Sequence, residues 1–141
     1  MITEEITRFI EGISLAMVAS ADISGNPHLA LGSGIKVLDD THLALENWYC
    51  QTTLRNLEQN QRIAIAVMAG DSKIGYQFIG AVTYGYDVAI LNGYAPDMEA
   101  PGEPQALTRI VMRVDKILAF CSGIHTDQQL GDGFRYRSSL S

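Results

Sequence analysis

Short apolar segments separated by turn residues constrain the fold of this chain more than any other feature of its sequence. The clearest is the segment 62–69, RIAIAVMA, in which Ile63, Ile65 and Val67 alternate with the residues that would face the other way. Such alternation predicts a β-strand, because successive side chains of a strand point to opposite faces of the sheet. Six segments predict strands in this way: 14–20, 28–38, 42–47, 62–69, 74–84 and 107–120.

Two short helices accompany the predicted strands. Apolar residues recur at helical spacing near the start of the chain, which predicts an N-terminal helix within 1–13, capped by Thr3 and packed as a lid on the strands. The segment 52–60, TTLRNLEQN, predicts a second helix that ends at Asn60. Many strands at short spacing, with one helix between the third and the fourth, indicate a mainly β (α+β) fold and a small closed or split barrel rather than a parallel sheet.

The length of 141 residues fits one domain that spans 1–141. The segment 92–106 holds three of the four prolines and is predicted to be a surface loop. Its acids Asp97, Glu99 and Glu103 would repel a phosphate, so this loop is not expected to form part of a phosphate site. The tail 122–141 is polar, and we expect it to be poorly ordered or docked on a partner.

Charge and composition limit the partners and the compartment. A net charge of −6 argues against nucleic acid or an anionic membrane as the main partner. No apolar run reaches the length of about 18 residues that a membrane-spanning helix needs. The N-terminus carries acids and does not have the pattern of a signal peptide. The two cysteines, Cys50 and Cys121, are therefore expected to be reduced thiols of a cytoplasmic protein.

Several familiar sites are not predicted. The GSG at 32–34 lacks the third glycine and the following helix of a dinucleotide-binding turn, and it indicates either a barrel bend or a place where a ligand ring meets the backbone. His28, His42 and His125 show no metal-ligand spacing, so no metal site is predicted. Cys50 precedes a helix start, where the dipole would lower the pKa of its thiol, but nothing marks it as a nucleophile.

One lysine and two threonines suggest an anion site. Lys36 follows a run of apolar residues, where a charge is costly unless it faces solvent or a partner. Thr52 and Thr53 open a helix, whose unpaired N–H groups favour a phosphate. A hairpin from Lys36 to Glu46 would return the chain close to the lysine. We therefore predict a phosphomonoester site, with an exposed lysine and an ordinary threonine cap as the alternative.

Together these segments resemble the pyridoxamine 5′-phosphate oxidase-like, FMN-binding split-barrel family, and most of all its small bacterial FMN-binding proteins. The resemblance covers about residues 15–84 and lies in MVASADISGNPHLA, GIKVLDDTHLAL, TTLRNLEQNQRIAIAV and YQFIGAV. It implies a six-stranded antiparallel split β-barrel with short flanking helices. It also implies a homodimer with FMN at the interface, and a small-molecule redox partner or substrate.

The resemblance implies which residues would hold the FMN. The phosphate would contact Lys36, Thr52 and Thr53, by position. The backbone of Ser33, Gly34 and Ile35 would face the isoalloxazine ring. Glu46 and Asn47, at the end of the third predicted strand, would border the ring. Gln77, on the fifth predicted strand, would complete the site from the other subunit.

The activity implied by the resemblance is that of an FMN-dependent oxidoreductase, in which the flavin does the redox chemistry. The chain ends in FRYRSSLS and lacks the C-terminal substrate motif of the true oxidases, so we do not expect oxidation of pyridoxamine phosphate. Two alternatives stay open: a non-catalytic FMN-binding electron carrier, and a split barrel that holds haem or a deazaflavin instead.

Overall fold

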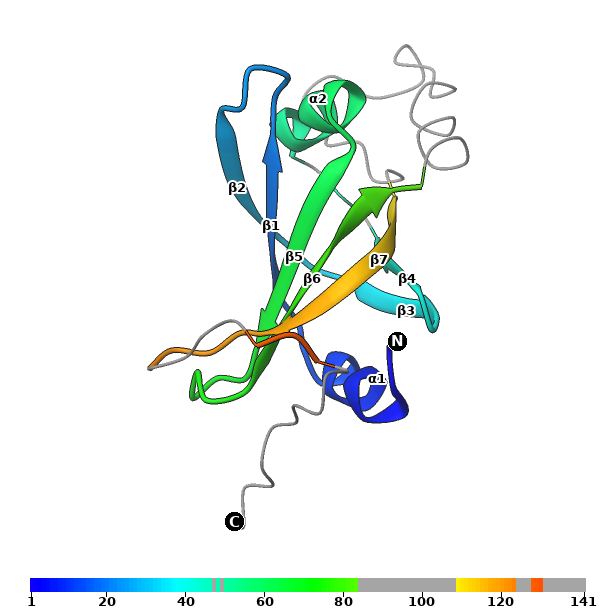
Figure 1. Cartoon of the computed structure of the whole chain (residues 1–141), viewed down its shortest axis with the longest axis vertical. Helices are drawn as coiled ribbons and strands as arrows, with labels where there is room; N and C mark the ends of the chain where they lie inside the picture. Colours follow the sequence, from blue (N-terminus) through cyan, green and yellow to red (C-terminus); the bar gives the residue numbers. More distant parts are fainter. Residues whose placement is uncertain (47, 49, 84–108, 124–127, 131–141) are drawn as a thin grey trace, which may run out of the picture.

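The computed structural model of the chain describes residues 1–46, 48, 50–83, 109–123 and 128–130. The predicted loop 92–106 and most of the tail 122–141 lie outside the described residues. Within the described part, the chain forms seven strands rather than the six predicted (Figure 1). The elements follow in the order α1 (Glu4–Glu11), β1 (Ala16–Ala21), β2 (Pro27–Gly32), β3 (Ile35–Asp39), β4 (His42–Leu45), α2 (Gln51–Gln59), β5 (Arg62–Met68), β6 (Gly75–Val82) and β7 (Ile110–Ala119).

The seventh strand arises because the predicted strand 28–38 is two strands, β2 and β3. The strands pair antiparallel in the order β2-β1-β5-β6-β7-β4-β3, so β2 and β3 are the two edges of one sheet. Only Ser33 and Gly34 connect these edges. The sheet therefore curls until its edges meet at this bend and stays open elsewhere, which makes it a split β-barrel (Figure 1).

Gly34 makes the bend possible. Its φ of +71° lies in the left-handed region that side chains disfavour. Its carbonyl oxygen accepts a hydrogen bond from the Glu46 N–H at 3.1 Å. A Cβ at position 34 would lie only 3.2 Å from the Cβ of Glu46. Both the backbone angle and the close approach favour glycine at this position.

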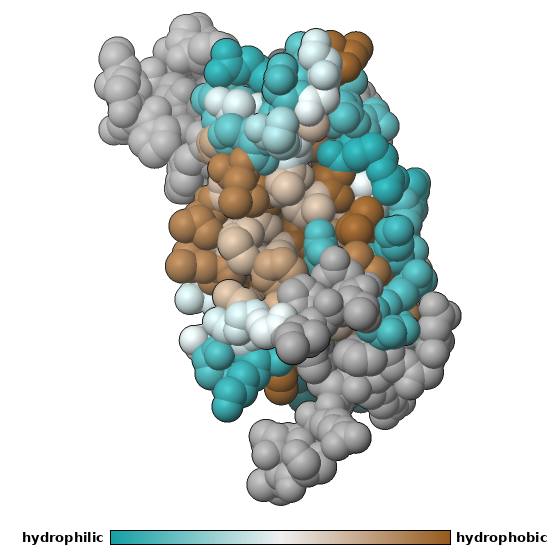
Figure 2. All heavy atoms as spheres, turned by 60° about the vertical axis from the view of Figure 1, so that its left-hand side comes forward, coloured by the Kyte–Doolittle hydropathy of each residue, from teal (hydrophilic) through white to brown (hydrophobic). Residues whose placement is uncertain are grey.

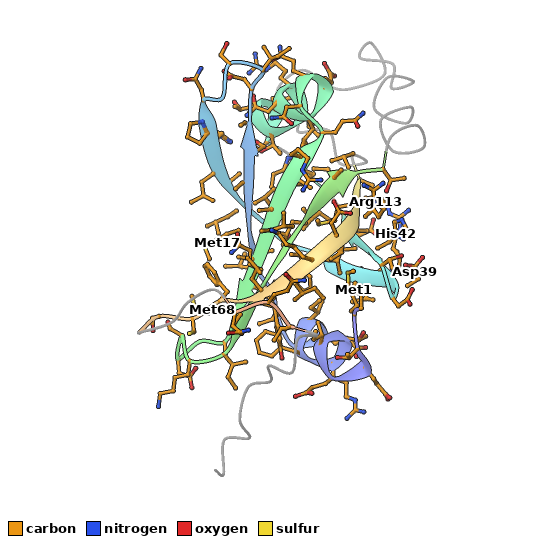
Figure 3. All side chains as sticks on the ribbon, viewed as in Figure 1. Met1, Met17, Asp39, His42, Met68 and Arg113 are labelled. Carbon is orange, nitrogen blue, oxygen red and sulfur yellow. The ribbon has the colours of Figure 1, made fainter. Side chains whose placement is uncertain are left out.

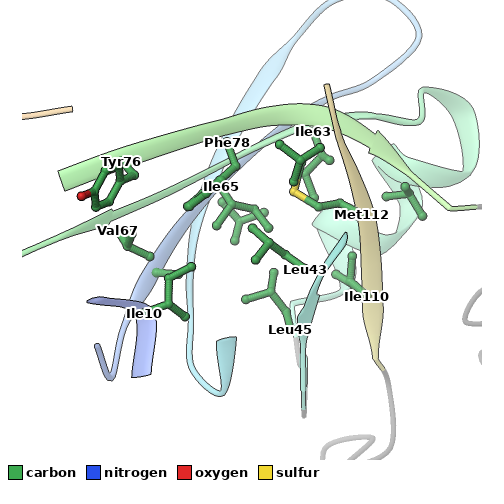
Figure 4. Close-up of a cluster of buried hydrophobic side chains, with 14 of the residues drawn as sticks. Ile10, Leu43, Leu45, Ile63, Ile65, Val67, Tyr76, Phe78, Ile110 and Met112 are labelled. Atoms are coloured by element: carbon green, nitrogen blue, oxygen red, sulfur yellow. The ribbon is translucent and has the colours of Figure 1, made fainter. Parts of the chain in front are cut away.

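The hydrophobic core fills the inside of the curled sheet. Ile63, Ile65 and Val67 of β5 are buried there, as their alternation predicted. Phe78 of β6 and Met112 of β7 are fully buried in the same cluster (Figure 4). Burying one large apolar side chain stabilises the fold by about 1.5–3 kcal/mol. The cluster therefore stabilises the strands that carry the residues on the outside of the sheet.

Helix α1 covers one end of the barrel, as the lid prediction required (Figure 1). Its N-cap is Thr3, whose hydroxyl accepts a hydrogen bond from the Ile6 N–H at 3.2 Å. Ile6 and Ile10 are buried against the core. The ring of Phe9 meets that of Tyr76 edge to face, with 5.0 Å between centroids. The helix is therefore held by apolar contacts along one face and capped by its own sequence.

The outer surface of β1, β2 and β5 is also apolar. Leu29 and Leu31 of β2 are 66% and 67% exposed, and they stand opposite Ala19 and Met17 of β1. Ala64 of β5 continues the row beside Ala19. We call these five residues the outer apolar face, and Figure 2 shows apolar side chains gathered there between hydrophilic ends. Contiguous apolar patches of this kind mark interaction surfaces.

Candidate functional site

The β3–β4 hairpin places Lys36 on the outside of the barrel. Lys36 stands opposite Ala44 in the antiparallel ladder and is exposed. It forms no ion pair with any residue that the structure describes. Ser33 and Gly34, just before it, are exposed as well, and Ile35 is half-buried. The structure thus gathers these four predicted residues at one corner, with a free cation beside accessible backbone.

Glu46 closes this corner together with an arginine that the sequence did not point to. The Glu46 carboxylate accepts a hydrogen bond from Arg109 Nε at 3.2 Å, across 63 residues of sequence. Both side chains are about two-thirds covered, being 32% and 29% exposed. No local motif marks Arg109, because its partner is set by the pairing of Leu45 with Ile110 between β4 and β7.

The start of α2 lies open to an anion. Its N-cap residue is Cys50, no side chain makes a capping hydrogen bond, and no acid occupies its first turn. Thr52 is half-buried, whereas Thr53 is fully buried and its hydroxyl lies beside the Cys50 thiol. Of the two predicted threonines, only Thr52 is partly exposed. The backbone N–H groups of the first turn are the other donors here.

The thiol of Cys50 reports the electrostatics of this helix start. Burial raises its pKa, but the polar groups of Thr53 and Thr52 and the charge of Arg55 outweigh burial and hold the pKa below its usual value. The sequence predicted the same direction from the dipole of this helix start. Cys50 and Cys121 are both free thiols.

Trp48 connects the start of α2 to the bend. A Cβ at Gly32 would overlap the Trp48 ring, at 2.2 Å from Cζ3. The indole N–H donates to the Cys50 carbonyl at 3.0 Å. The ring that packs against Gly32 in this structure is that of Trp48, and a ligand ring against the GSG backbone stays a prediction. The same contact ties the helix start to the residue that precedes Ser33.

Helix α2 rests on a buried polar pair. The Asn56 side-chain amide donates to the Ser20 hydroxyl of β1 at 3.1 Å, and both residues are buried. His28 of β2 stands opposite Ser20 on the same face, and its buried Nδ1 has no partner among the described residues. A directional contact of this kind fixes how the helix is rotated on the sheet.

The β3–β4 hairpin, which carries Lys36, is closed at its other end by a compact turn (Figure 3). Asp39 accepts hydrogen bonds from the Thr41 N–H at 2.8 Å and is 2.9 Å from Nδ1 of His42. The Thr41 N–H and the His42 side chain lower the pKa of Asp39 to about 2. This turn fixes the pairing of β3 with β4, and with it the position of Lys36.

Gln77 lies apart from the other predicted residues. It stands on β6 opposite Ala66 and Leu118. Lys36 pairs with Ala44, and Ala44 pairs with Val111, so these three residues lie in one row across the sheet. Thr83, further along the chain from Gln77, lies beside this row, because its N–H donates to the Val111 carbonyl at 2.9 Å. Six residues of strand separate Gln77 from Thr83, or about 20 Å. Within one protomer Gln77 is therefore remote from Lys36. Asn47 lies outside the described residues.

No group of three or more His, Cys, Asp or Glu side chains is placed to hold a metal ion among the described residues. None of the helices described is long and apolar enough to cross a membrane.

Comparison with known proteins identifies the family. The family model described as pyridoxamine 5′-phosphate oxidase matches residues 2–121. The chain belongs to this family. The resemblance inferred from the motifs is thereby confirmed. Among curated proteins, no sequence matches this chain.

Solved structures agree with this assignment. HupZ from Group A Streptococcus has a TM-score of 0.63 and 28% identity, over 89% of this chain and 99% of that chain. An FMN-binding protein from Syntrophomonas wolfei has a TM-score of 0.59 and 14% identity, over 85% of each chain. HutZ, a haem storage protein from Vibrio cholerae, has a TM-score of 0.57 and 12% identity, over 82% of this chain and 92% of that chain. The last two show the shared fold alone.

Proposed function

We propose that this protein is an FMN-binding flavoprotein that works as an FMN-dependent oxidoreductase in the cytoplasm. The observation that carries the proposal is the corner of the hairpin, where Lys36 is unpaired beside the exposed backbone of Ser33 and Gly34. In a chain with a net charge of −6, a free cation at an exposed corner is where a phosphate would bind. Family membership and the fold shared with an FMN-binding protein support the same cofactor.

The residues present fit the phosphate and ring of FMN. Lys36 supplies a charge, the first turn of α2 supplies N–H donors, and the Thr52 hydroxyl supplies one more. Gly34 has no side chain between its backbone and a flat ring. When bound, FMN would supply the transfer of hydride or electrons, and the protein would bind and orient it and tune its potential.

The proposal includes a homodimer with FMN at the interface. The outer apolar face would be covered by a second copy, because Leu29 and Leu31 are otherwise left in water. Gln77 is too remote to complete the site of its own protomer, but it would reach that of a partner across this interface. An obligate interface of this kind buries more than about 2,000 Å².

The test is a titration of FMN and riboflavin into the parent protein and Lys36→Ala. The substitution should weaken FMN binding by about 1.5–3 kcal/mol, or one to two orders of magnitude, because a charge-assisted hydrogen bond is lost. Riboflavin, which lacks the phosphate, should lose much less. Equal losses for both ligands would remove Lys36 from the phosphate site.

Three further measurements on the purified parent protein separate the alternatives. Oxidation of a reduced nicotinamide with an electron acceptor would distinguish an oxidoreductase from an electron carrier. A Soret band in the absorption spectrum, with no response to added FMN, would reject FMN in favour of haem. Sedimentation of a stable monomer at micromolar concentration would reject the homodimer.

A further inference from the structure

The corner of the proposed FMN site contains an acid as well as a cation. Because Lys36 stands opposite Ala44, Glu46 is its diagonal neighbour on the same outer face. The Glu46 N–H bond to the Gly34 carbonyl continues the ladder to this residue. Diagonal neighbours across an antiparallel pair lie about 7–8 Å apart, which long side chains can bridge. On this geometry alone, Glu46 and Lys36 would be partners.

The structure pairs Glu46 with Arg109 instead. Arg109 Nε is 3.2 Å from Glu46 Oε1, and Lys36 remains without an ion pair among the described residues. This contact is also the most covered carboxylate–guanidinium pair in the described part of the chain. In the other pairs, Glu4 with Arg8 and Asp115 with Arg62 and Arg113, the arginine is 56% exposed or more, against 29% for Arg109.

We propose that Arg109 is a positioning residue of the FMN site, which holds the Glu46 carboxylate so that Lys36 stays free for the phosphate. The inference rests on the proposed function and extends it to a residue outside the phosphate shell. Without Arg109, the Glu46 carboxylate would turn to Lys36, neutralise it and repel the phosphate. The ion pair with Arg109 thus offsets the negative charge of Glu46 beside the proposed phosphate site.

A purely structural role for Arg109 makes different predictions. Arg109 also ties the end of β4 to the start of β7, and loss of that tie alone would disturb the whole corner. It would then weaken FMN and riboflavin alike, and removing Glu46 as well would not repair it. The charge role instead predicts a loss confined to the phosphate-bearing ligand, which disappears when the acid is removed.

The first experiment titrates FMN and riboflavin into the parent protein and Arg109→Gln. We expect FMN to bind about tenfold more weakly to the variant, since one charge at this range changes binding by about an order of magnitude. Riboflavin should change less than about threefold. The matched control is Arg113→Gln, which removes an arginine four positions along with the same Nε–carboxylate distance of 3.2 Å, to Asp115. The control should bind both ligands as the parent does.

The second experiment tests the coupling of the three charges. The double variant Glu46→Gln with Arg109→Gln should regain the FMN affinity of the parent protein, because Lys36 is again unpaired. Adding Lys36→Ala to Arg109→Gln should cost clearly less FMN affinity than Lys36→Ala costs in the parent. Such non-additivity is the signature of residues that act through one another.

The outcomes are distinct. FMN-specific loss with rescue by the double variant supports the inference. An unchanged FMN affinity in Arg109→Gln, equal losses for both ligands, or no rescue overturns it and leaves the proposed function standing. A parent protein that binds no FMN overturns the proposed function, and this inference with it.

Discussion

The two helices of this protein begin in opposite ways. Helix α1 is capped by the Thr3 hydroxyl and has Glu4 and Glu5 in its first turn, so its N–H groups and its dipole are met by its own sequence. Helix α2 has no side-chain capping bond and no acid in its first turn. The N-terminal end of a helix carries the equivalent of about half a unit of positive charge, and the first turn of α2 contains no acid to offset it.

The helices also differ in how they are seated. Helix α1 packs through Ile6 and Ile10 against the core, whereas α2 adds the buried hydrogen bond from Asn56 to Ser20. Apolar packing tolerates small rotations, but a hydrogen bond has direction. The comparison indicates that α1 is a cover and that α2 is a helix whose orientation matters.

The largest expected effect comes from giving α2 the kind of start that α1 has. Cys50→Asp places a preferred N-cap and a negative charge where the phosphate would bind. FMN affinity should fall by about 100-fold, because like charges meet at close range, while riboflavin should change little. The free energy of unfolding should rise by up to about 1 kcal/mol, because the cap is improved. Titration of both ligands and urea unfolding measure the two effects.

The control for this substitution is Cys50→Ser, which adds a cap without a charge. It should be stabilised in the same direction and keep most of its FMN affinity. If Cys50→Ser and Cys50→Asp lost FMN affinity equally, the effect would be steric and the contrast between the helix starts would have no electrostatic meaning.

The second prediction concerns the buried hydrogen bond that holds α2 on the sheet. Ser20→Ala leaves the buried amide of Asn56 without its partner and should lower the free energy of unfolding by about 1–3 kcal/mol. Urea unfolding checks this value. Thr7→Ala, which removes an exposed hydrogen bond to the Thr3 carbonyl on α1, is the matched control and should change stability by less than about 0.5 kcal/mol. Equal losses of stability in the two variants would show that α1 and α2 do not differ in how they are held on the barrel.

The third prediction concerns a substitution that removes the N-cap of α1. Thr3→Ala should cost about 1 kcal/mol of stability, because the Ile6 N–H loses its acceptor. FMN affinity should stay unchanged, since no residue of α1 belongs to the proposed FMN site. A loss of FMN affinity in this variant, measured by the same titration, would contradict the separation of roles between the helices.

The smallest effect uses Cys50 as a probe of the α2 start. Because its pKa is lowered, its thiolate forms at lower pH than that of an ordinary cysteine. In a Cys121→Ser background, alkylation by iodoacetamide should therefore reach its plateau rate at lower pH than for a cysteine peptide. At neutral pH the reaction should be several-fold slower with saturating FMN than without it. An identical pH profile for protein and peptide would count against a positive potential at this helix start.

Local patterns in the sequence were sufficient for much of the fold. The alternation of Ile63, Ile65 and Val67 predicted β5 and its buried face, and Thr3 predicted the α1 cap. These features depend on neighbours within one turn or one strand. The phosphate residues were predicted from the same kind of local evidence, and the titrations above are what would test them.

Features that depend on distant contacts were out of reach. The break between β2 and β3 was missed because the run HLALGSGIKVL stays apolar through the bend, and only the contact of Gly34 with Glu46 shows why the chain turns. Arg109 was missed for the same reason, since its partner is 63 residues away. The Trp48 ring fills the space over Gly32, which no spacing within the GSG could indicate.

The bend at Ser33 and Gly34 has a consequence for how the gene can vary in length. Ile35 and Val37 of β3 pack against the core and fix its pairing with β4, and the outer leucines fix β2, so the number of residues between the two strands is set from both sides. An insertion or deletion of one codon here cannot be absorbed by sliding a strand, because a slip of one position would turn Lys36 into the core. Natural variation should therefore replace residues around this bend, glycine excepted, but not change their number.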